Sequence, residues 1–250
     1  PPPSDDAYEV VQGVVDLFNL LLLPRSSPPG IPLEDLWAAA SVFCQRRRAF
    51  LLMEPPPVWT GVQTPAAQIT TLRTGVARQY AALYYPYIVY AEDRTRINIG
   101  ATGAIAGLMA RIDGEVGVWK APAGSEADLR GVVGVAERLS DTQNGVLNQR
   151  GINAIRAFPT GIVSWGARTL DGDDNFASEY KYVPIRRLAL FLEESLYRGL
   201  QWVVFQPNAE PLWAQIRLNV GAFMQGLFRR RAFQGTTPDQ ADFVKCDAVT

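Results

Sequence analysis

Apolar positions in the first part of the chain alternate between short dense runs and segments of helical spacing. Residues 14–24 (VVDLFNLLLLP) form an apolar, partly β-branched run that ends in a proline-rich turn, which predicts a buried strand. Residues 33–48 place Trp37 and Phe43 at helical spacing and end in three arginines, which favour a helix C-terminus over a binding patch. Residues 49–54 form a second apolar run. Strand, helix and strand in this order predict a βαβ unit and a parallel sheet.

The middle of the chain continues the alternation with weaker signals. Residues 68–79 predict a second helix, and residues 80–90 (YAALYYPYIVY) predict an aromatic strand interrupted at Pro86, as suits a sheet edge or a bulge. Residues 101–112 are rich in small residues with helical spacing. Further short strands are expected at 132–136, 152–158 and 162–170.

Two amphipathic helices dominate the last third of the chain. The first ends at Gly199, and its expected apolar face consists of Ile185, Leu188, Ala189, Leu192 and Leu196. The second has Pro211 in its first turn, and its apolar stripe consists of Leu212, Ile216, Val220, Phe223 and Leu227. Two surface helices that cover a sheet would explain both apolar faces. The polar face that each helix keeps is also available to dock a partner.

Composition and charge exclude several classes of partner. A chain of 250 residues with 48% hydrophobic residues can build a sizeable core. The net charge of -1 gives no cationic field, so we expect no binding to nucleic acid. Cys44 and Cys246 are the two cysteines and predict no disulfide framework. Since no apolar run reaches ~20 residues and no basic leader precedes one, we expect neither membrane insertion nor a signal peptide.

The chain contains no histidine, which decides most about possible chemistry. Ser-His-Asp and Cys-His sites are excluded, although carboxylate pairs, lysine nucleophiles and Mg²⁺ sites are not. Asp171, Asp173 and Asp174 resemble part of a calcium loop, but the glycine and the glutamate that such a loop requires are missing, which favours a solvated acidic loop. The glycines of residues 100–117 fit no phosphate-binding motif. We therefore predict no catalytic, metal-binding or cofactor-binding residue.

Several segments together resemble the sheath proteins of contractile phage tails, R-type pyocins and extracellular contractile injection systems. The most specific are GVWKAPAG at 117–124 and the block from FLEES at 191–195 to EPLW at 210–213. Weaker segments include VDLFNLLLLP, CQRRRAFLLMEPP, AALYYPYI, NGVLNQRGINAIRAFP, IVSWGARTL and ADFVKCD, so that the resemblance extends over nearly the whole chain.

The resemblance implies a fold and a mechanical function. It implies an α/β, sheath-type (subtilisin-like) domain with a mixed, largely parallel sheet flanked by helices. We expect a frayed segment at 1–13, a sheath domain at 14–170, and a C-terminal region at 171–250 with two helices and a terminal strand. The implied role is a structural subunit, and no enzyme, of a sheath that polymerises around an inner tube and contracts to drive the tube through a target membrane.

The resemblance also implies partners and contact residues. Partners would be identical subunits, the inner tube protein, and baseplate and cap proteins, in a tail or injection particle assembled in the bacterial cytoplasm. Tube-facing candidates are the charged residues of the two late helices: Arg217, Arg229, Arg230, Arg231, Arg186, Arg187, Glu193 and Glu194. Candidates for a strand that contacts a neighbouring subunit are Asp242, Phe243, Val244, Lys245 and Cys246.

Other interpretations remain open. The family's terminal arms are expected to be missing from this chain, which would then be a core that polymerises poorly alone. A structural module of a phage or injection particle that does not contract would use the same fold. An α/β enzyme would instead require a deep cleft with convergent polar groups at the carboxyl ends of the strands.

Overall fold

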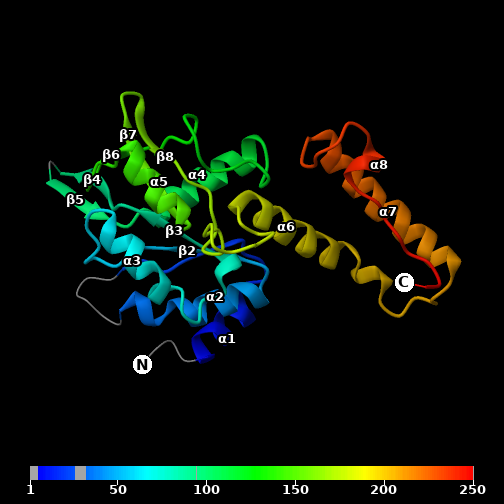
Figure 1. Ribbon diagram of the computed structural model, residues 1–250. Helices are drawn as coiled ribbons and strands as arrows, with labels where there is room; N and C mark the ends of the chain where they lie inside the picture. The colour runs from blue at the N-terminus through cyan, green and yellow to red at the C-terminus, as the bar shows by residue number, and fades with distance from the viewer. Residues whose placement is uncertain (1–4, 26–31, 94, 250) are drawn as a thin grey trace. The chain divides into compact units, whose positions relative to one another are not determined.

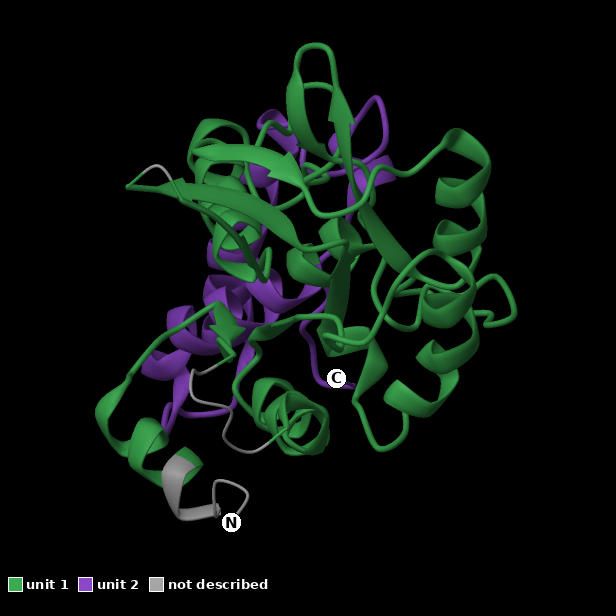
Figure 2. Cartoon of the chain, turned by 90° about the vertical axis from the view of Figure 1, so that its left-hand side faces the viewer, with its two compact units in different colours: residues 1–188 green, residues 189–250 purple. Residues whose placement is uncertain are grey.

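A computed structural model describes residues 5–25, 32–93 and 95–249 of the chain. The chain forms two compact units, Pro1–Leu188 and Ala189–Thr250, which Figure 2 colours separately. The division falls inside helix α6 (Val183–Gly199), whereas we had placed a boundary at 170/171.

Unit 1 is built around a five-stranded sheet of order β1-β2-β3-β7-β8. The first four strands in this order run parallel, and the last pairs antiparallel with its neighbour. The predicted largely parallel α/β class is therefore confirmed. The strands are β1 (Leu20–Leu22), β2 (Phe50–Met53), β3 (Ala81–Tyr85), β7 (Ile152–Phe158) and β8 (Gly161–Ser164).

Helices cover both faces of this sheet (Figure 1). Along one face, α2 (Trp37–Arg46) packs on β2, α5 (Asp141–Gln149) packs on β7, and α3 (Gln63–Leu72) contacts α5. On the other face, α4 (Thr102–Glu115) contacts β1 and β2. Because β2 and β3 are covered on both sides, every one of their residues is buried. Short 3-10 helices lie at Leu33–Asp35 and Arg78–Tyr80.

The N-terminal part of unit 1 differs from the prediction. Residues 5–14 form helix α1 (Asp5–Val14) where we expected a frayed segment, and the predicted strand at 14–24 shrinks to the three residues of β1. Arg47 explains how α1 ends, because its guanidinium donates to the carbonyls of Val15 (2.7 Å) and Asp16 (2.8 Å). The arginines also end α2 as predicted, with Arg46 in its last turn and Arg47 at its C-cap, so the Arg47 side chain links the ends of the two helices.

The aromatic run at 80–90 divides between two sheets. It leaves the main sheet at the cis Tyr85–Pro86 bond and enters a three-stranded antiparallel sheet of order β5-β4-β6. These strands are β4 (Ile88–Glu92), β5 (Thr95–Ile99) and β6 (Val132–Val135). The predicted interruption at Pro86 is thus the point where the chain passes from the main sheet to the second sheet.

Unit 2 consists of helices. It contains the second part of α6, a 3-10 helix at Gln201–Val203, α7 (Glu210–Arg229) and the short α8 (Pro238–Ala241). Phe191 of α6 and Phe223 of α7 bring their rings to 6.2 Å between centroids, and Leu227 is buried. The predicted stripe of α7 therefore faces inward. Among the described residues, no helix is both long and apolar enough to cross a membrane.

Candidate functional site

The two arginines of α6 that we predicted to face a partner lie in the interior of unit 1. Arg187 is 5% exposed and binds Asp113 of α4 with both ends of its guanidinium, at 2.9 Å and 2.5 Å. Arg186 is 3% exposed, and its guanidinium lies 4.2 Å from the ring centroid of Tyr80 and 4.3 Å from that of Tyr180. Both arginines hold α6 in place, and neither offers its charge to a partner in this structure.

This burial corrects the apolar face predicted for the start of α6. The inward positions are Val183, Arg186, Arg187 and Leu190, while Ile185 is half exposed. The spacing of three and four residues is helical as expected, but the face is rotated. A buried guanidinium is stable here because an aromatic pair covers one and a carboxylate neutralises the other.

The later charged residues of α6 lie in unit 2. Glu193 is exposed, and Glu194 accepts a hydrogen bond of 2.6 Å from Nε of Arg198, four residues further along the helix. Such a pair stabilises an isolated helix by only about 0.3 kcal/mol. The pair of Glu194 and Arg198 therefore keeps its charges near the surface of the helix, close to solvent.

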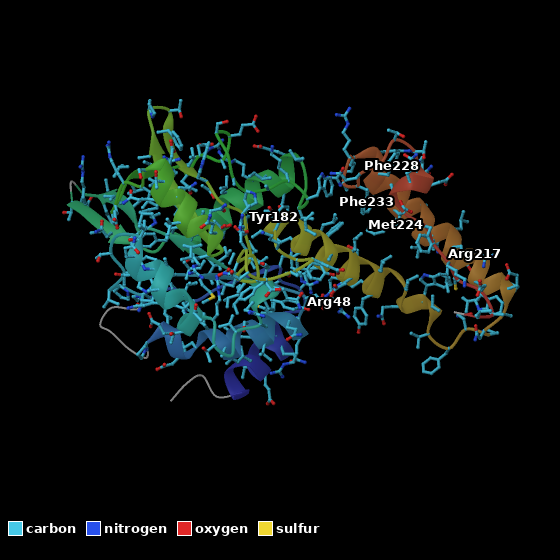
Figure 3. All side chains as sticks on the ribbon, viewed as in Figure 1. Arg48, Tyr182, Arg217, Met224, Phe228 and Phe233 are labelled. Atoms are coloured by element: carbon cyan, nitrogen blue, oxygen red, sulfur yellow. The ribbon has the colours of Figure 1, made fainter. Side chains whose placement is uncertain are left out.

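The charged residues of α7 fall into two groups. Arg217 is turned toward its own unit, where it donates to the carbonyl of Cys246 and, at 2.5 Å, to the carboxylate of Glu210. Arg229, Arg230 and Arg231 are exposed at the end of the helix. Figure 3 shows Arg217 on the earlier half of α7, with Met224, Phe228 and Phe233 grouped toward its other end. The cluster at 229–231 is the larger cationic surface of unit 2.

The segment predicted to be a terminal strand forms none within the described part of the chain. Residues 242–246 follow α8 and belong to neither sheet, although the backbone of Asp242 is extended. Together with α7 this segment borders a groove of about 540 Å³. Its Phe243 side chain is 89% exposed. The role of the segment in subunit contacts stays a prediction.

Sequence reasoning missed a solvent-exposed apolar tip between α6 and α7. Trp202, Val204 and Phe205 all expose their side chains there, and that of Phe205 is exposed completely. The signal in the sequence was the run WVVF between the end of one helix and Pro207. Four apolar residues in a linker are unusual, because linkers ordinarily carry polar residues.

The acidic loop after Leu170 is an ion-pair network. Asp173 is buried and accepts from Arg73 (2.8 Å), while Asp174 accepts from Arg168 (2.7 Å) and Lys181 (2.6 Å). Burial would raise the pKa of Asp173, but hydrogen bonds from Arg73 and Asn175 outweigh it and lower the pKa. Within the described residues, no three acidic or cysteine side chains gather to hold a metal ion. The acidic loop is therefore held by ion pairs and is not merely solvated.

The GVWKAPAG segment has a structural explanation. Gly117 has φ of 140°, and a Cβ at this position would lie 2.4 Å from the Trp119 ring. Gly124 donates its backbone N–H to the carbonyl of Ser164 at 2.9 Å. Only glycine allows the backbone at Gly117 to pass this close to the Trp119 ring. The motif therefore fixes a turn against the end of β8.

A cavity of about 920 Å³ in unit 1 lies beyond the carboxyl ends of β1 and β2. The carboxyl ends of the strands are the side on which α/β enzymes bind ligands, but this cavity lies beside the edge strand β1. Its walls are mostly apolar, and Arg25 and Glu34 in them pair with each other at 3.2 Å. In unit 1, burial also raises the pKa of the Cys44 thiol to about 12, which makes it a poor nucleophile.

Comparison with known proteins gives one family and a set of similar structures. The profile of the phage tail sheath protein central domain matches residues 34–170, more than half of the chain. No curated protein sequence matches.

Among solved structures, the PVC sheath complex of an extracellular contractile injection system, in the contracted state, is 28% identical with a TM-score of 0.76. The match covers 95% of this chain and 63% of that one. The anti-feeding prophage baseplate structure is also 28% identical, with a TM-score of 0.76 and coverage of 94% and 60%. A sheath tail protein from Desulfitobacterium hafniense, at 15% identity, a TM-score of 0.64 and coverage of 94% and 51%, shares the fold. This chain thus spans about three fifths of the length of the first two.

Proposed function

Because this chain belongs to the phage tail sheath protein family, we propose that it is a structural subunit of a contractile sheath. The observation that carries the proposal is the 28% identity, over 95% of the chain, to a sheath solved in its contracted state. In this role the subunit polymerises around an inner tube, and contraction of the polymer drives the tube through a target membrane. Identical subunits, the tube, and baseplate and cap proteins are its partners, in a particle assembled in the bacterial cytoplasm.

The strand order of unit 1 supports a structural role over an enzymatic one. Ligands of open α/β sheets bind where the strand order reverses. In this sheet the parallel strands β1, β2, β3 and β7 advance in one direction, so the described strands contain no such reversal. The cavity near β1 lies at the edge of the sheet. Binding of a small molecule with catalytic turnover there would favour the enzymatic alternative.

The mechanism proposed for contraction is an exchange of many weak contacts. An exposed ion pair contributes about 0.2–1 kcal/mol, so a single subunit stores little energy. A lattice in which every subunit exchanges the same contacts changes state collectively. The free energy released on contraction is then the sum over all subunits of the lattice.

For the tube contact, we propose the exposed charges on the surface of unit 2. Arg186 and Arg187 are left out because they are buried, and Arg217 takes part in holding residues around Cys246. Arg229, Arg230 and Arg231, with Glu193 and Glu194, remain. A cluster of three arginines fits an acidic surface on the tube and strengthens association most at low salt.

Charge reversal at this cluster tests the tube contact. We expect Arg229→Glu with Arg231→Glu in the full-length protein to reduce the number of sheathed tubes in negative-stain micrographs about tenfold, since the contact becomes repulsive. Arg96→Glu with Arg130→Glu makes the same charge change on exposed positions of unit 1 and should leave assembly unchanged. Equal assembly by both variants would remove the arginine cluster from the proposal. Failure of the unmodified protein to sheathe any tube would remove the proposed function.

A further inference from the structure

The structure points to a contact between two copies of this chain that we propose as new: the tip (Trp202, Val204 and Phe205) of one copy inserts into the groove of another. The groove is the hollow of about 540 Å³ between α7 and residues 238–244. This inference deepens the proposed function, because it supplies a specific subunit–subunit contact for the polymer.

The tip is an apolar protrusion on a defined backbone turn. Phe205 is 100% exposed and has φ of 67°, a left-handed conformation that is costly for a bulky side chain. The turn is closed on itself, since Gln206 donates its backbone N–H to the carbonyl of Val203 at 3.0 Å. An aromatic side chain has only two side-chain dihedrals to fix on binding, and aromatic residues are the usual anchors of interfaces. Strained backbone that holds such a side chain in water indicates a function for it.

The groove has the shape and lining to receive an aromatic side chain. Its wall on α7 carries the small residues Gly221 and Ala222, and a Cβ added at Gly221 would meet no atom within 4 Å. Leu218 and Phe243 border it, with 70% and 89% of their surface exposed. The volume exceeds what one ring fills, so there is room for Phe205 and an apolar neighbour.

Tip and groove also complement each other in hydrogen bonding. Asp242 lines the groove, and its Oδ2 is buried without a hydrogen-bond partner among the described residues. Trp202 at the tip has an indole N–H for which the described residues show no acceptor. A buried carboxylate oxygen without a donor is costly. If the side chain of Asp242 turns toward the groove when the tip enters, the indole N–H can donate to it and both groups are satisfied.

A second copy is the occupant that these features favour. Phe205 is completely exposed, so the tip does not fill the groove of its own chain. A protrusion and a hollow at different places on one chain form a head-to-tail contact, and such a contact propagates into an open polymer unless it closes into a ring. A helical sheath is a polymer of this kind.

Cross-linking between two differently labelled chains tests the contact. In a Cys246→Ser background, one chain carries Phe205→Cys and the other carries Ala222→Cys, and the mixture is oxidised. We expect a disulfide-linked heterodimer. Phe205→Cys paired with Val58→Cys, an exposed position in unit 1, should give at least tenfold less product. Equal yields from both pairs, or no product from either, would overturn the proposal.

Sedimentation velocity on chains without engineered cysteines gives an independent measurement. We expect the unmodified chain to self-associate with rising concentration, and Phe205→Gly to associate at least tenfold more weakly. Glycine suits the left-handed backbone, and the Phe205 ring touches nothing, so the melting temperature of this variant should not fall. Association of Phe205→Gly equal to that of the unmodified chain would contradict the contact.

Experiments on the full-length protein distinguish failure of the tip–groove contact from failure of the proposed sheath function. If full-length Phe205→Gly sheathes tubes as well as the unmodified protein does, the contact is wrong and the sheath function stands. If the unmodified full-length protein forms no sheath but the Phe205–Ala222 cross-link appears, the contact stands and the function falls. If Ala222→Cys is shielded from thiol reagents in full-length monomers, the groove is filled by its own chain and the proposal is overturned.

Discussion

Single polar residues inside unit 1 fix where segments distant in sequence meet. Asn153 on β7 is the clearest case, because its amide donates to the carbonyls of Leu83 (3.1 Å) and Arg168 (2.7 Å) and accepts from the N–H of Arg168 (2.6 Å). Gly166 passes so close that a Cβ there would lie 2.8 Å from Asn153. A buried amide with all these bonds made specifies one register for the chain.

Glu54 is the opposite case, a buried carboxylate that is only partly satisfied. It is 4% exposed at the end of β2, and its Oε1 accepts from Thr102 at 3.1 Å while Oε2 has no partner among the described residues. Burial raises the pKa of Glu54, although Thr102 and Arg25 oppose the shift. The cost of burying Glu54 is offset by its place at the start of α4, because the first turn of that helix carries no acidic residue of its own.

We predict that Glu54→Gln stabilises unit 1 at pH 7.5 by about 1 kcal/mol, because the charge is no longer buried. The folded state holds the Glu54 proton more tightly than the unfolded state, so the unmodified protein loses stability as pH rises from the unfolded pKa through the raised one. The advantage of glutamine should therefore shrink as pH falls toward 4.5. Urea unfolding at several pH values measures it.

Glu126→Gln is the control for this prediction, because that side chain is 86% exposed. It should change stability by less than about 0.5 kcal/mol at every pH. An advantage of Glu54→Gln that is the same at pH 4.5 and pH 7.5 would show that folding does not raise the pKa of Glu54.

At the scale of elements, the first part of α6, residues 183–188, is held within unit 1 by polar contacts as well as by apolar packing. The pair Arg187–Asp113 joins α6 to α4, and its two members differ in exposure, with 5% of the arginine side chain exposed and 25% of the aspartate side chain. Removing the more exposed partner leaves a buried charge without its counterion. Removing the buried partner leaves a carboxylate that water can still reach.

This asymmetry gives a prediction. Asp113→Ala should destabilise unit 1 by about 3 kcal/mol or more, and Arg187→Leu by clearly less. The double variant should be more stable than Asp113→Ala alone, because no unpaired charge remains. Urea unfolding of the unmodified protein, the two single variants and the double variant measures these differences as a double-mutant cycle. The control is Lys120→Ala, which removes an exposed ion pair of 3.6 Å and should change the free energy of unfolding by less than about 0.5 kcal/mol. Equal losses in both single variants would refute the argument.

The sequence predicted elements better than it predicted their faces and ends. Dense runs such as 50–53 became buried strands, and the period of α7 placed its stripe inward, since both signals depend on local pattern. The face of α6 was missed because Arg186 and Arg187 are polar in any hydropathy pattern. Their burial depends on Tyr80, Tyr180 and Asp113, which lie far away in the sequence.

The candidate surfaces were predictable to a similar extent. The arginines at 229–231 follow from the end of a periodic helix and are exposed as expected. The groove needs α7 and residues 238–244 side by side, and no local pattern predicts that arrangement. The tip was visible as an apolar linker, but its exposure and the left-handed backbone of Phe205 could be read only from coordinates.

For the whole molecule, the two units differ in how much they bury. The buried apolar residues described in unit 1 include all of β2 and β3, whereas in unit 2 they are Leu190 and Leu227. Local opening is easiest where little apolar surface is buried. The stability of this chain is therefore concentrated in the sheet.

Hydrogen exchange monitored by mass spectrometry should show this difference. We expect amides of β2, β3 and β7 to exchange slowest, and those of α7 to exchange at least tenfold faster, through openings that leave unit 1 folded. Amides of α7 and β3 that exchange at the same rate would indicate that the chain unfolds as one cooperative unit. On assembly into a polymer, exchange in α7 should slow down.

The passage of the chain from β3 to β4 has a mechanical consequence. β3 lies between β2 and β7, and only Pro86 and Tyr87 separate its last residue from the first residue of β4. A pull on the outer hairpin of β4 and β5 is therefore transmitted directly to the middle of the main sheet, where hydrogen bonds to two flanking strands share the load. Unit 1 can bear tension from its periphery without a compliant joint.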